Sequence, residues 1–103
     1  MQYMAKIAGQ PVALRYSMNS LCAMEDLTGG ALEKMLERQF SAARLLLWGG
    51  MLENAPGLTL KAAGEKIDEH IRAGGTLEEI VEECARAMEC AGYFDAAMGE
   101  KGA

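Results

Sequence analysis

The sequence predicts a mainly α-helical, compact domain of about five helices with an N-terminal β-hairpin. Apolar residues recur every three or four positions through most of the chain, as they do on one face of a helix. Gly-Gly pairs interrupt this periodicity, and only the first residues alternate with period two. A chain of 103 residues corresponds to one domain. We expect this domain to cover residues 1–98, and residues 99–103 to form a flexible tail with nothing to bury.

Residues 3–16 predict the β-hairpin. Its two strands flank a turn at Gly9-Gln10-Pro11, and the character of the side chains alternates on both sides of that turn. The positions that share a face are Tyr3, Ala5 and Ile7 before the turn and Val12, Leu14 and Tyr16 after it. Because an isolated hairpin is only marginally stable in water, this one must pack on the helices or pair with another chain. Self-association into a homo-oligomer is therefore a further expectation.

Residues 19–28 and 31–40 each predict a short helix. The first is capped by Ser17 or Asn19, carries one apolar stripe and ends at Gly29-Gly30. The apolar face of the second consists of Leu32, Met35, Leu36 and Phe40. Its charged residues repel their neighbours four positions away, so packing rather than charge pairing must hold this helix.

Residues 41–52 predict the central helix of the domain. They contain the only Trp and the longest unbroken apolar run, so apolar side chains point in nearly every direction. A helix that is apolar all round is covered all round. Ser41 is the expected N-cap. Two glycines in a helix interior cost about 1 kcal/mol each relative to Ala, so at Gly49 and Gly50 either the helix ends or a neighbouring element comes close.

Two further helices are expected after the break at Pro56-Gly57. Thr59 caps the first, which runs to about residue 73, and Thr76 caps the second through a Thr-x-x-Glu capping box. The apolar stripe of the second helix is Leu77, Ile80, Val81, Cys84, Met88 and Ala91, and its acidic residues are Glu78, Glu79, Glu82, Glu83 and Glu89. We interpret these acidic residues as a solvated face, with a docking surface for a basic partner as the alternative.

Composition narrows the classes of partner. The net charge is -5, and the basic residues are scattered singly. This distribution disfavours nucleic acid and anionic membrane surfaces as partners, because both need clustered Lys and Arg. No apolar run approaches the length of a membrane span. Near the N-terminus Lys6 interrupts the apolar stretch that a signal peptide would need. Three Cys, an odd number, do not suggest a disulfide framework. We therefore expect a cytoplasmic protein.

No motif for catalysis or for cofactor binding is present. The single His70 has no Cys or His partner at metal-binding spacing, so we expect it at the surface or its boundary. Cys84 is interpreted as a buried structural residue rather than a nucleophile. No glycine-rich nucleotide motif occurs. We expect no cofactor, no metal and no enzymatic activity, since no cluster of titratable groups suited to acid/base or nucleophilic chemistry is visible.

Methionine is abundant, with eight residues in the chain. Met fills irregular gaps in cores, and it also forms adaptable surfaces that bind varied partners. The first interpretation is the simpler one. The second requires that some Met side chains remain accessible. Met18, Met24, Met35, Met51 and Met88 are the ones that could form such a surface.

Three segments carry a family resemblance. Residues 14–26 read LRYSMNSLCAMED, residues 44–51 read RLLLWGGM, and residues 58–68 read LTLKAAGEKID. Together, and in this order, they resemble the small tail assembly chaperones of long-tailed bacteriophages and related gene transfer agents. The likeness covers about residues 12–90. Gly49 departs from the family pattern, in which we expect Ala, and this departure weakens the central helix.

The resemblance implies a non-enzymatic role in building the phage tail. Such chaperones bind the tape measure protein, keep its apolar helices from aggregating, help tail tube protein subunits gather around it, and are absent from the mature virion. In many phages a ribosomal frameshift also produces a longer form, and this chain is then expected to be the short one. The candidate partner-binding residues are Trp48, Met51, Met88, Tyr93 and Phe94.

Two other functions remain open from the sequence. One is a small phage or prophage structural protein, of the tail or connector, that is retained in the virion. The other is an unrelated small regulatory interaction protein. Detection in purified particles would favour the first, and binding to DNA or to a toxin would favour the second.

Overall fold

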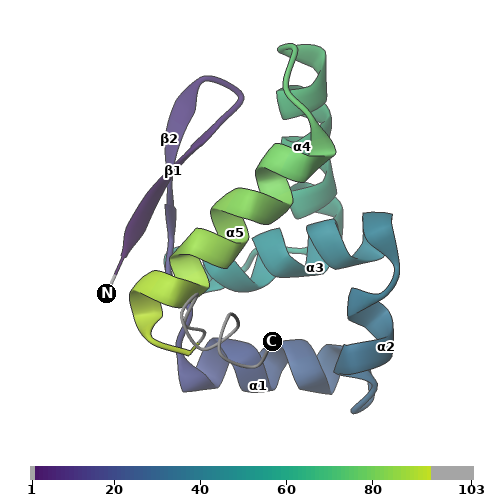
Figure 1. Ribbon diagram of the computed structural model, residues 1–103. Helices are drawn as coiled ribbons and strands as arrows, with labels where there is room; N and C mark the ends of the chain where they lie inside the picture. The colour runs from purple at the N-terminus through teal and green to yellow at the C-terminus, as the bar shows by residue number, and fades with distance from the viewer. Residues whose placement is uncertain (1, 94–103) are drawn as a thin grey trace, which may run out of the picture.

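The computed structural model describes residues 2–93 as two strands and five helices, which confirms the predicted fold class (Figure 1). The elements are β1 (Tyr3–Ile7), β2 (Gln10–Leu14), α1 (Met18–Leu27), α2 (Leu32–Leu36), α3 (Gln39–Leu52), α4 (Leu60–Arg72) and α5 (Leu77–Ala91). The predicted tail at residues 99–103 lies outside the described residues. No helix within residues 2–93 combines the length and the apolarity needed to cross a membrane.

Helix α3 is the centre of the domain, as its all-round apolar sequence predicts. It contacts α1, α2, α4, α5 and β2, and Figure 1 shows it passing between α1 on one side and α4 and α5 on the other. Its buried residues are Ala42, Ala43, Leu45, Leu47, Trp48, Gly49 and Gly50. A helix that contacts five other elements buries most of its surface, so apolar residues occupy most of its circumference, and the exposed exceptions, which include Phe40 and Arg44, lie in its N-terminal half.

Gly49 and Gly50 lie where two elements come close to the backbone of α3. A β-carbon on Gly49 would overlap the side chain of Met24 in α1, and one on Gly50 would lie 2.9 Å from the hydroxyl oxygen of Tyr16. The carbonyl of Gly50 also accepts a hydrogen bond from the Arg15 N–H at 2.7 Å. The helix therefore continues through both residues, and the predicted close approach is confirmed.

The hairpin turn lies one or two residues earlier than predicted. Ala8 and Gly9 both have positive φ, at 56° and 76°, which is the backbone of a two-residue hairpin turn whose twist matches the strands. Gln10 and Pro11 are therefore part of β2. Pro11 is tolerated there because it faces Lys6, whose N–H points away from the ladder and donates to Glu83 of α5 at 3.0 Å.

The boundary between the second and third helices differs from the prediction. Helix α2 ends at Leu36, and α3 begins at Gln39 with Arg38 at its N-cap position, so Phe40 and Ser41 are both inside α3. The Ala42 N–H already bonds to the Arg38 carbonyl at 2.7 Å. A Ser cap contributes only about 1 kcal/mol, which is too little to fix a helix start when tertiary packing favours another position.

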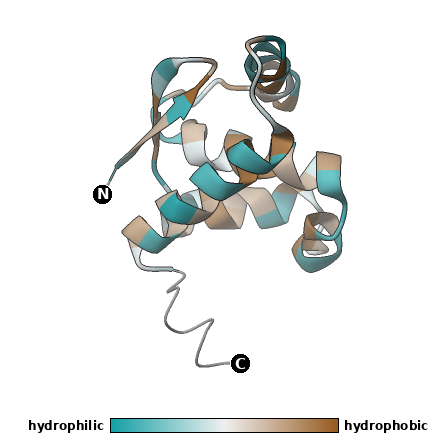
Figure 2. Cartoon of the chain, turned by 45° about the horizontal axis from the view of Figure 1, so that its top comes forward, coloured by the Kyte–Doolittle hydropathy of each residue, from teal (hydrophilic) through white to brown (hydrophobic). Residues whose placement is uncertain are grey.

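The two C-terminal helices begin and end where local signals predict. The Thr59 hydroxyl accepts a hydrogen bond from the Ala62 N–H at 3.1 Å, and Thr76 and Glu79 form the capping box of α5. On α5 the predicted stripe is confirmed, since Ile80, Cys84 and Met88 are buried. Figure 2 shows hydrophilic residues along the outward surface of α5. This helix thus presents one face to the core and another to solvent.

Candidate functional site

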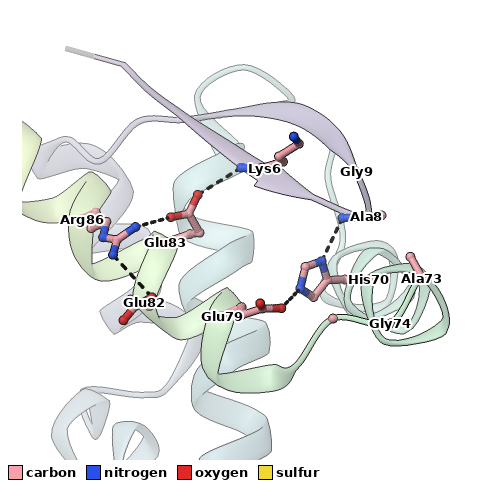
Figure 3. A pocket seen from close by; sticks show the side chains of 11 residues that line it. Lys6, Ala8, Gly9, His70, Ala73, Gly74, Glu79, Glu82, Glu83 and Arg86 are labelled. Atoms are coloured by element: carbon pink, nitrogen blue, oxygen red, sulfur yellow. Dashed lines mark hydrogen bonds and ion pairs between the residues drawn. The ribbon is translucent and has the colours of Figure 1, made fainter.

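One pocket gathers polar groups where the hairpin, α4 and α5 meet (Figure 3). His70 lines this pocket and is 8% exposed, so it is buried rather than at the surface or its boundary as the sequence predicts. Its Nδ1 accepts a hydrogen bond from the Ala8 N–H at 2.9 Å, and its Nε2 lies 2.9 Å from Oε1 of Glu79. The helix periodicity placed His70 next to an apolar face but could not reveal these two long-range partners.

This geometry fixes the proton on His70. A backbone N–H can only donate, so Nδ1 must be the unprotonated nitrogen and Nε2–H donates to the Glu79 carboxylate. The same carboxylate oxygen accepts from the Thr76 N–H at 2.8 Å. These hydrogen bonds hold the pKa of Glu79 below its usual value, the Thr76 bond being the larger cause and the His70 bond the next. Both ring nitrogens are engaged in hydrogen bonds, so His70 ties the hairpin to two helices.

The carboxylates beside His70 are also engaged. Glu83 accepts hydrogen bonds from the Lys6 N–H and from the Tyr3 hydroxyl, each at 3.0 Å. Arg86 bridges Glu82 at 3.5 Å and Glu83 at 3.2 Å. Within residues 2–93 no three His, Cys, Asp or Glu residues are placed to hold a metal ion. The hydrogen bonds among the residues that line this pocket therefore hold the hairpin against α4 and α5.

Cys84 is buried in the core, as the sequence predicts. Burial raises the pKa of its thiol to about 12, so at neutral pH the nucleophilic thiolate is essentially absent. The neighbouring Tyr16 donates its hydroxyl hydrogen to the carbonyl of Leu46, and burial also raises the pKa of Tyr16. Both side chains belong to the hydrophobic core, and Tyr16 links the segment after β2 to α3.

A second depression has a different character. It is an apolar groove between α1, α2, α3 and α5, with a volume of about 390 Å³, which we call the α1–α5 groove. It is lined by Leu21, Met24, Leu32, Leu36, Ala42, Leu46, Val81, Ala85, Met88 and Glu89. Each helix contributes residues three or four positions apart, which is the spacing of one helix face. Glu89 is the only charged residue among them.

The groove continues along α5 toward its N-terminus. A neighbouring depression shares Leu36, Ala42, Val81 and Ala85 with the groove and adds Leu77. Its charged lining residues are Glu78 and Glu82, so the α5 side of the whole depression carries acidic residues. Figure 1 shows the four helices that line the groove, with α1 below α3 and α5 and with α2 beside one end of α1. The depression therefore combines an apolar lining with an acidic rim, which consists of Glu78, Glu82 and Glu89 on α5.

Of the five residues predicted to bind a partner, the four that the structure describes do not line one common surface. Met88 lines the groove, whereas Trp48 is 7% exposed and its indole N–H donates to the Leu58 carbonyl at 2.8 Å, so Trp48 is part of the core. Met51 is half-buried and is not among the residues lining the groove. Tyr93 is exposed just beyond α5. Phe94 lies outside the described residues.

Sequence reasoning assigned most of the groove to the core. The sequence predicts apolar stripes that include Leu32, Leu36 and Val81, but a stripe has the same spacing whether it faces the core or a groove. Ala42, Leu46 and Ala85 gave no separate signal. Only the packing of four helices decides that Leu36 and Ala85 stay exposed and Leu21, Leu32, Leu46 and Val81 partly exposed along one depression, whereas Ala42 is buried beneath them.

The comparisons with known proteins give no family and no neighbour. The chain matches no protein-family model, no curated protein and no solved structure.

Proposed function

We propose that this chain is a tail assembly chaperone of a long-tailed phage or related gene transfer agent. In this role it binds the tape measure protein in the bacterial cytoplasm and helps recruit tail tube subunits. The observation that carries the proposal is the α1–α5 groove, because a chaperone of this kind needs accessible apolar surface on a folded and soluble domain. The resemblance in residues 14–26, 44–51 and 58–68 supports the tape measure protein as the client.

The composition of the groove suits a client that must later be released. Leu36 and Ala85 expose apolar surface along the groove, and the flexible, polarisable side chains of Met24 and Met88 lie almost fully buried beneath it. Burying a leucine-sized side chain contributes roughly 1.5–3 kcal/mol, and association costs an estimated 4–15 kcal/mol or more. Two or three such side chains contribute roughly 3–9 kcal/mol, which is close to the cost of association, so apolar burial in the groove supports only weak and reversible binding. The net charge of -5 keeps the loaded chaperone soluble.

Co-expression with the tape measure protein encoded in the same genome tests the proposal. We expect a soluble complex that co-purifies, and aggregation of the tape measure protein when this chain is omitted. The exposed aliphatic residues Leu36 and Ile71 provide a matched pair of variants. Leu36→Glu places a charge in the groove and should abolish rescue, whereas Ile71→Glu, at an equally exposed site outside the groove, should leave it intact.

Two results would overturn the proposal. One is a tape measure protein that stays soluble alone and never co-purifies with this chain. The other is the recovery of this chain in stoichiometric amounts from purified particles, which would favour a structural tail or connector protein instead.

A further inference from the structure

We infer that the α1–α5 groove binds one amphipathic α-helical segment of about three turns, whose flank toward α5 carries Lys or Arg. The inference rests on the proposed function only in naming the tape measure protein as the source of that segment. The chemistry of the segment follows from the shape and the charge of the groove.

The length of the groove sets the length of its occupant. On α5 the lining residues extend from Leu77 to Glu89. Twelve helical steps of about 1.5 Å give roughly 18 Å, which is about three turns of a second helix lying alongside. The apolar members of this row, at residues 77, 81, 85 and 88, form a single ridge of the kind that packs into the groove of a facing helix.

A helical occupant fits better than an extended one. An extended segment binds mainly by main-chain hydrogen bonds to a free strand edge. The walls of the groove are four helices, whose backbone groups are already paired internally. A helix brings its own backbone hydrogen bonds and presents only side chains, so it leaves no buried polar group unpaired.

Ala85 marks the point of closest approach. It lies on the ridge between Val81 and Met88, it is exposed, and it lines both halves of the depression. A small residue between two larger ones leaves a gap into which a Leu-sized side chain of the occupant can insert. Substitution here changes the groove without changing the core.

The acidic residues beside the groove select the charge of the occupant, as the apolar ridge selects its shape. Glu78, Glu82 and Glu89 lie beside the ridge on α5, and no Lys or Arg is among the described residues that line the groove and its continuation. Glu82 already pairs with Arg86. Glu78 and Glu89 have no ion pair with another described residue, so they are the carboxylates that an occupant's cations would meet.

Model peptides test both halves of the inference. Three helix-stapled peptides of about 15 residues are compared: one with Leu at positions 1, 5, 8 and 12 and flanking Lys, one with Glu in place of Lys, and one with the Leu positions scrambled. Fluorescence anisotropy at low salt should show binding of the Leu/Lys peptide. The Leu/Glu peptide should bind at least about tenfold more weakly, and the affinity for Leu/Lys should fall as salt is raised. Equal affinities for all three peptides would overturn the inference.

Matched variants of the protein locate the binding. Ala85→Trp and Ala85→Lys should each reduce the affinity for the Leu/Lys peptide by about tenfold or more because they fill or charge the gap. Lys61→Trp, at an exposed site on α4, should not. The double variant E78Q/E89Q should weaken binding about three- to tenfold, whereas E65Q/E69Q changes the net charge equally and should have little effect. Equal losses of affinity in both double variants would mean that the net negative charge of the protein attracts the peptide. Glu78 and Glu89 would then not be specific contacts, and the acidic half of the inference would be overturned.

Other occupants of the groove have distinct signatures. Concentration-dependent dimerisation that Ala85→Trp abolishes, without peptide binding, would assign the groove to a second copy. A change in the NMR signals of residues 94–103 on the same substitution, again without peptide binding, would assign it to the chain's own C-terminal residues. Either result overturns the inference. If the tape measure protein co-purifies equally with wild type and Ala85→Trp, the inference fails while the proposed function stands. If the Leu/Lys peptide binds but the tape measure protein does not, the inference stands while the proposed function fails.

Discussion

The side chain of Met24 in α1 occupies the space that a β-carbon on Gly49 of α3 would need. Ala at residue 49 would favour the helix by about 1 kcal/mol, but overpacking a filled core costs about 1–3 kcal/mol. We therefore expect Gly49→Ala to lower the free energy of unfolding by about 1 kcal/mol in urea titrations. Gly64→Ala is the control, because its β-carbon would make only ordinary contact with Arg44, at 3.4 Å. This second change should stabilise the protein by up to about 1 kcal/mol, and a destabilised G64A would contradict the argument.

His70 should be found in the tautomer with its proton on Nε2. Imidazole nitrogen chemical shifts measure this directly, and a proton on Nδ1 would contradict the hydrogen bond from Ala8. Replacing His70 with Leu leaves the half-buried Ala8 N–H without its partner. The cost of such an unpaired group is about 1–3 kcal/mol, measurable by urea unfolding. Glu69→Ala, on the exposed side of α4, should change stability by no more than about 0.5 kcal/mol.

Acid should weaken the link between α4 and α5 through Glu79. The Thr76 and His70 hydrogen bonds lower the pKa of this carboxyl in the folded protein. A carboxyl whose pKa is lower when folded stabilises the protein above the unfolded pKa, about 4.3, and this contribution is lost as the pH falls through the folded pKa. The difference in urea midpoint between wild type and Glu79→Gln should therefore shrink between near-neutral pH and about pH 3.

The neighbouring Glu78 provides the control for this pH dependence. It is exposed on the same helix and is not part of the hydrogen-bond network around His70. The pH profile of Glu78→Gln should follow that of wild type. A difference between wild type and Glu79→Gln that stays constant over the whole pH range would show that the carboxylate charge does not matter.

Cys84 should be inert to thiol reagents in the folded protein. It is buried and its pKa is raised to about 12, whereas Cys22 is exposed. In the variant C22S/C90S, which keeps only Cys84, labelling near pH 8 should be slow and should accelerate when urea unfolds the chain. The variant C84S/C90S, which keeps Cys22, should label promptly. Rapid labelling of folded C22S/C90S would show that the core around Tyr16 opens readily.

The elements that the sequence determined are those whose signals lie within one or two turns of chain. The capping box of Thr76 and Glu79, the cap at Thr59 and the apolar stripe of α5 all depend on residues no more than a few positions apart. Such hydrogen bonds need only a few residues of chain, and they form at Thr59 and Thr76, where tertiary packing does not shift the helix start as it does at Ser41. The all-round apolar character of α3 is also local, and it predicted that other elements surround this helix.

Tertiary structure decided the features that need partners distant in sequence. The hairpin turn lies at Ala8 and Gly9, and Pro11 pairs with Lys6 in the strands. The Ala8 N–H donates a hydrogen bond to His70, which is buried. The groove itself exists only because four apolar helix faces meet without closing completely. Residue spacing fixes which side of a helix is apolar, but the depth to which that side is covered depends on how the helices pack.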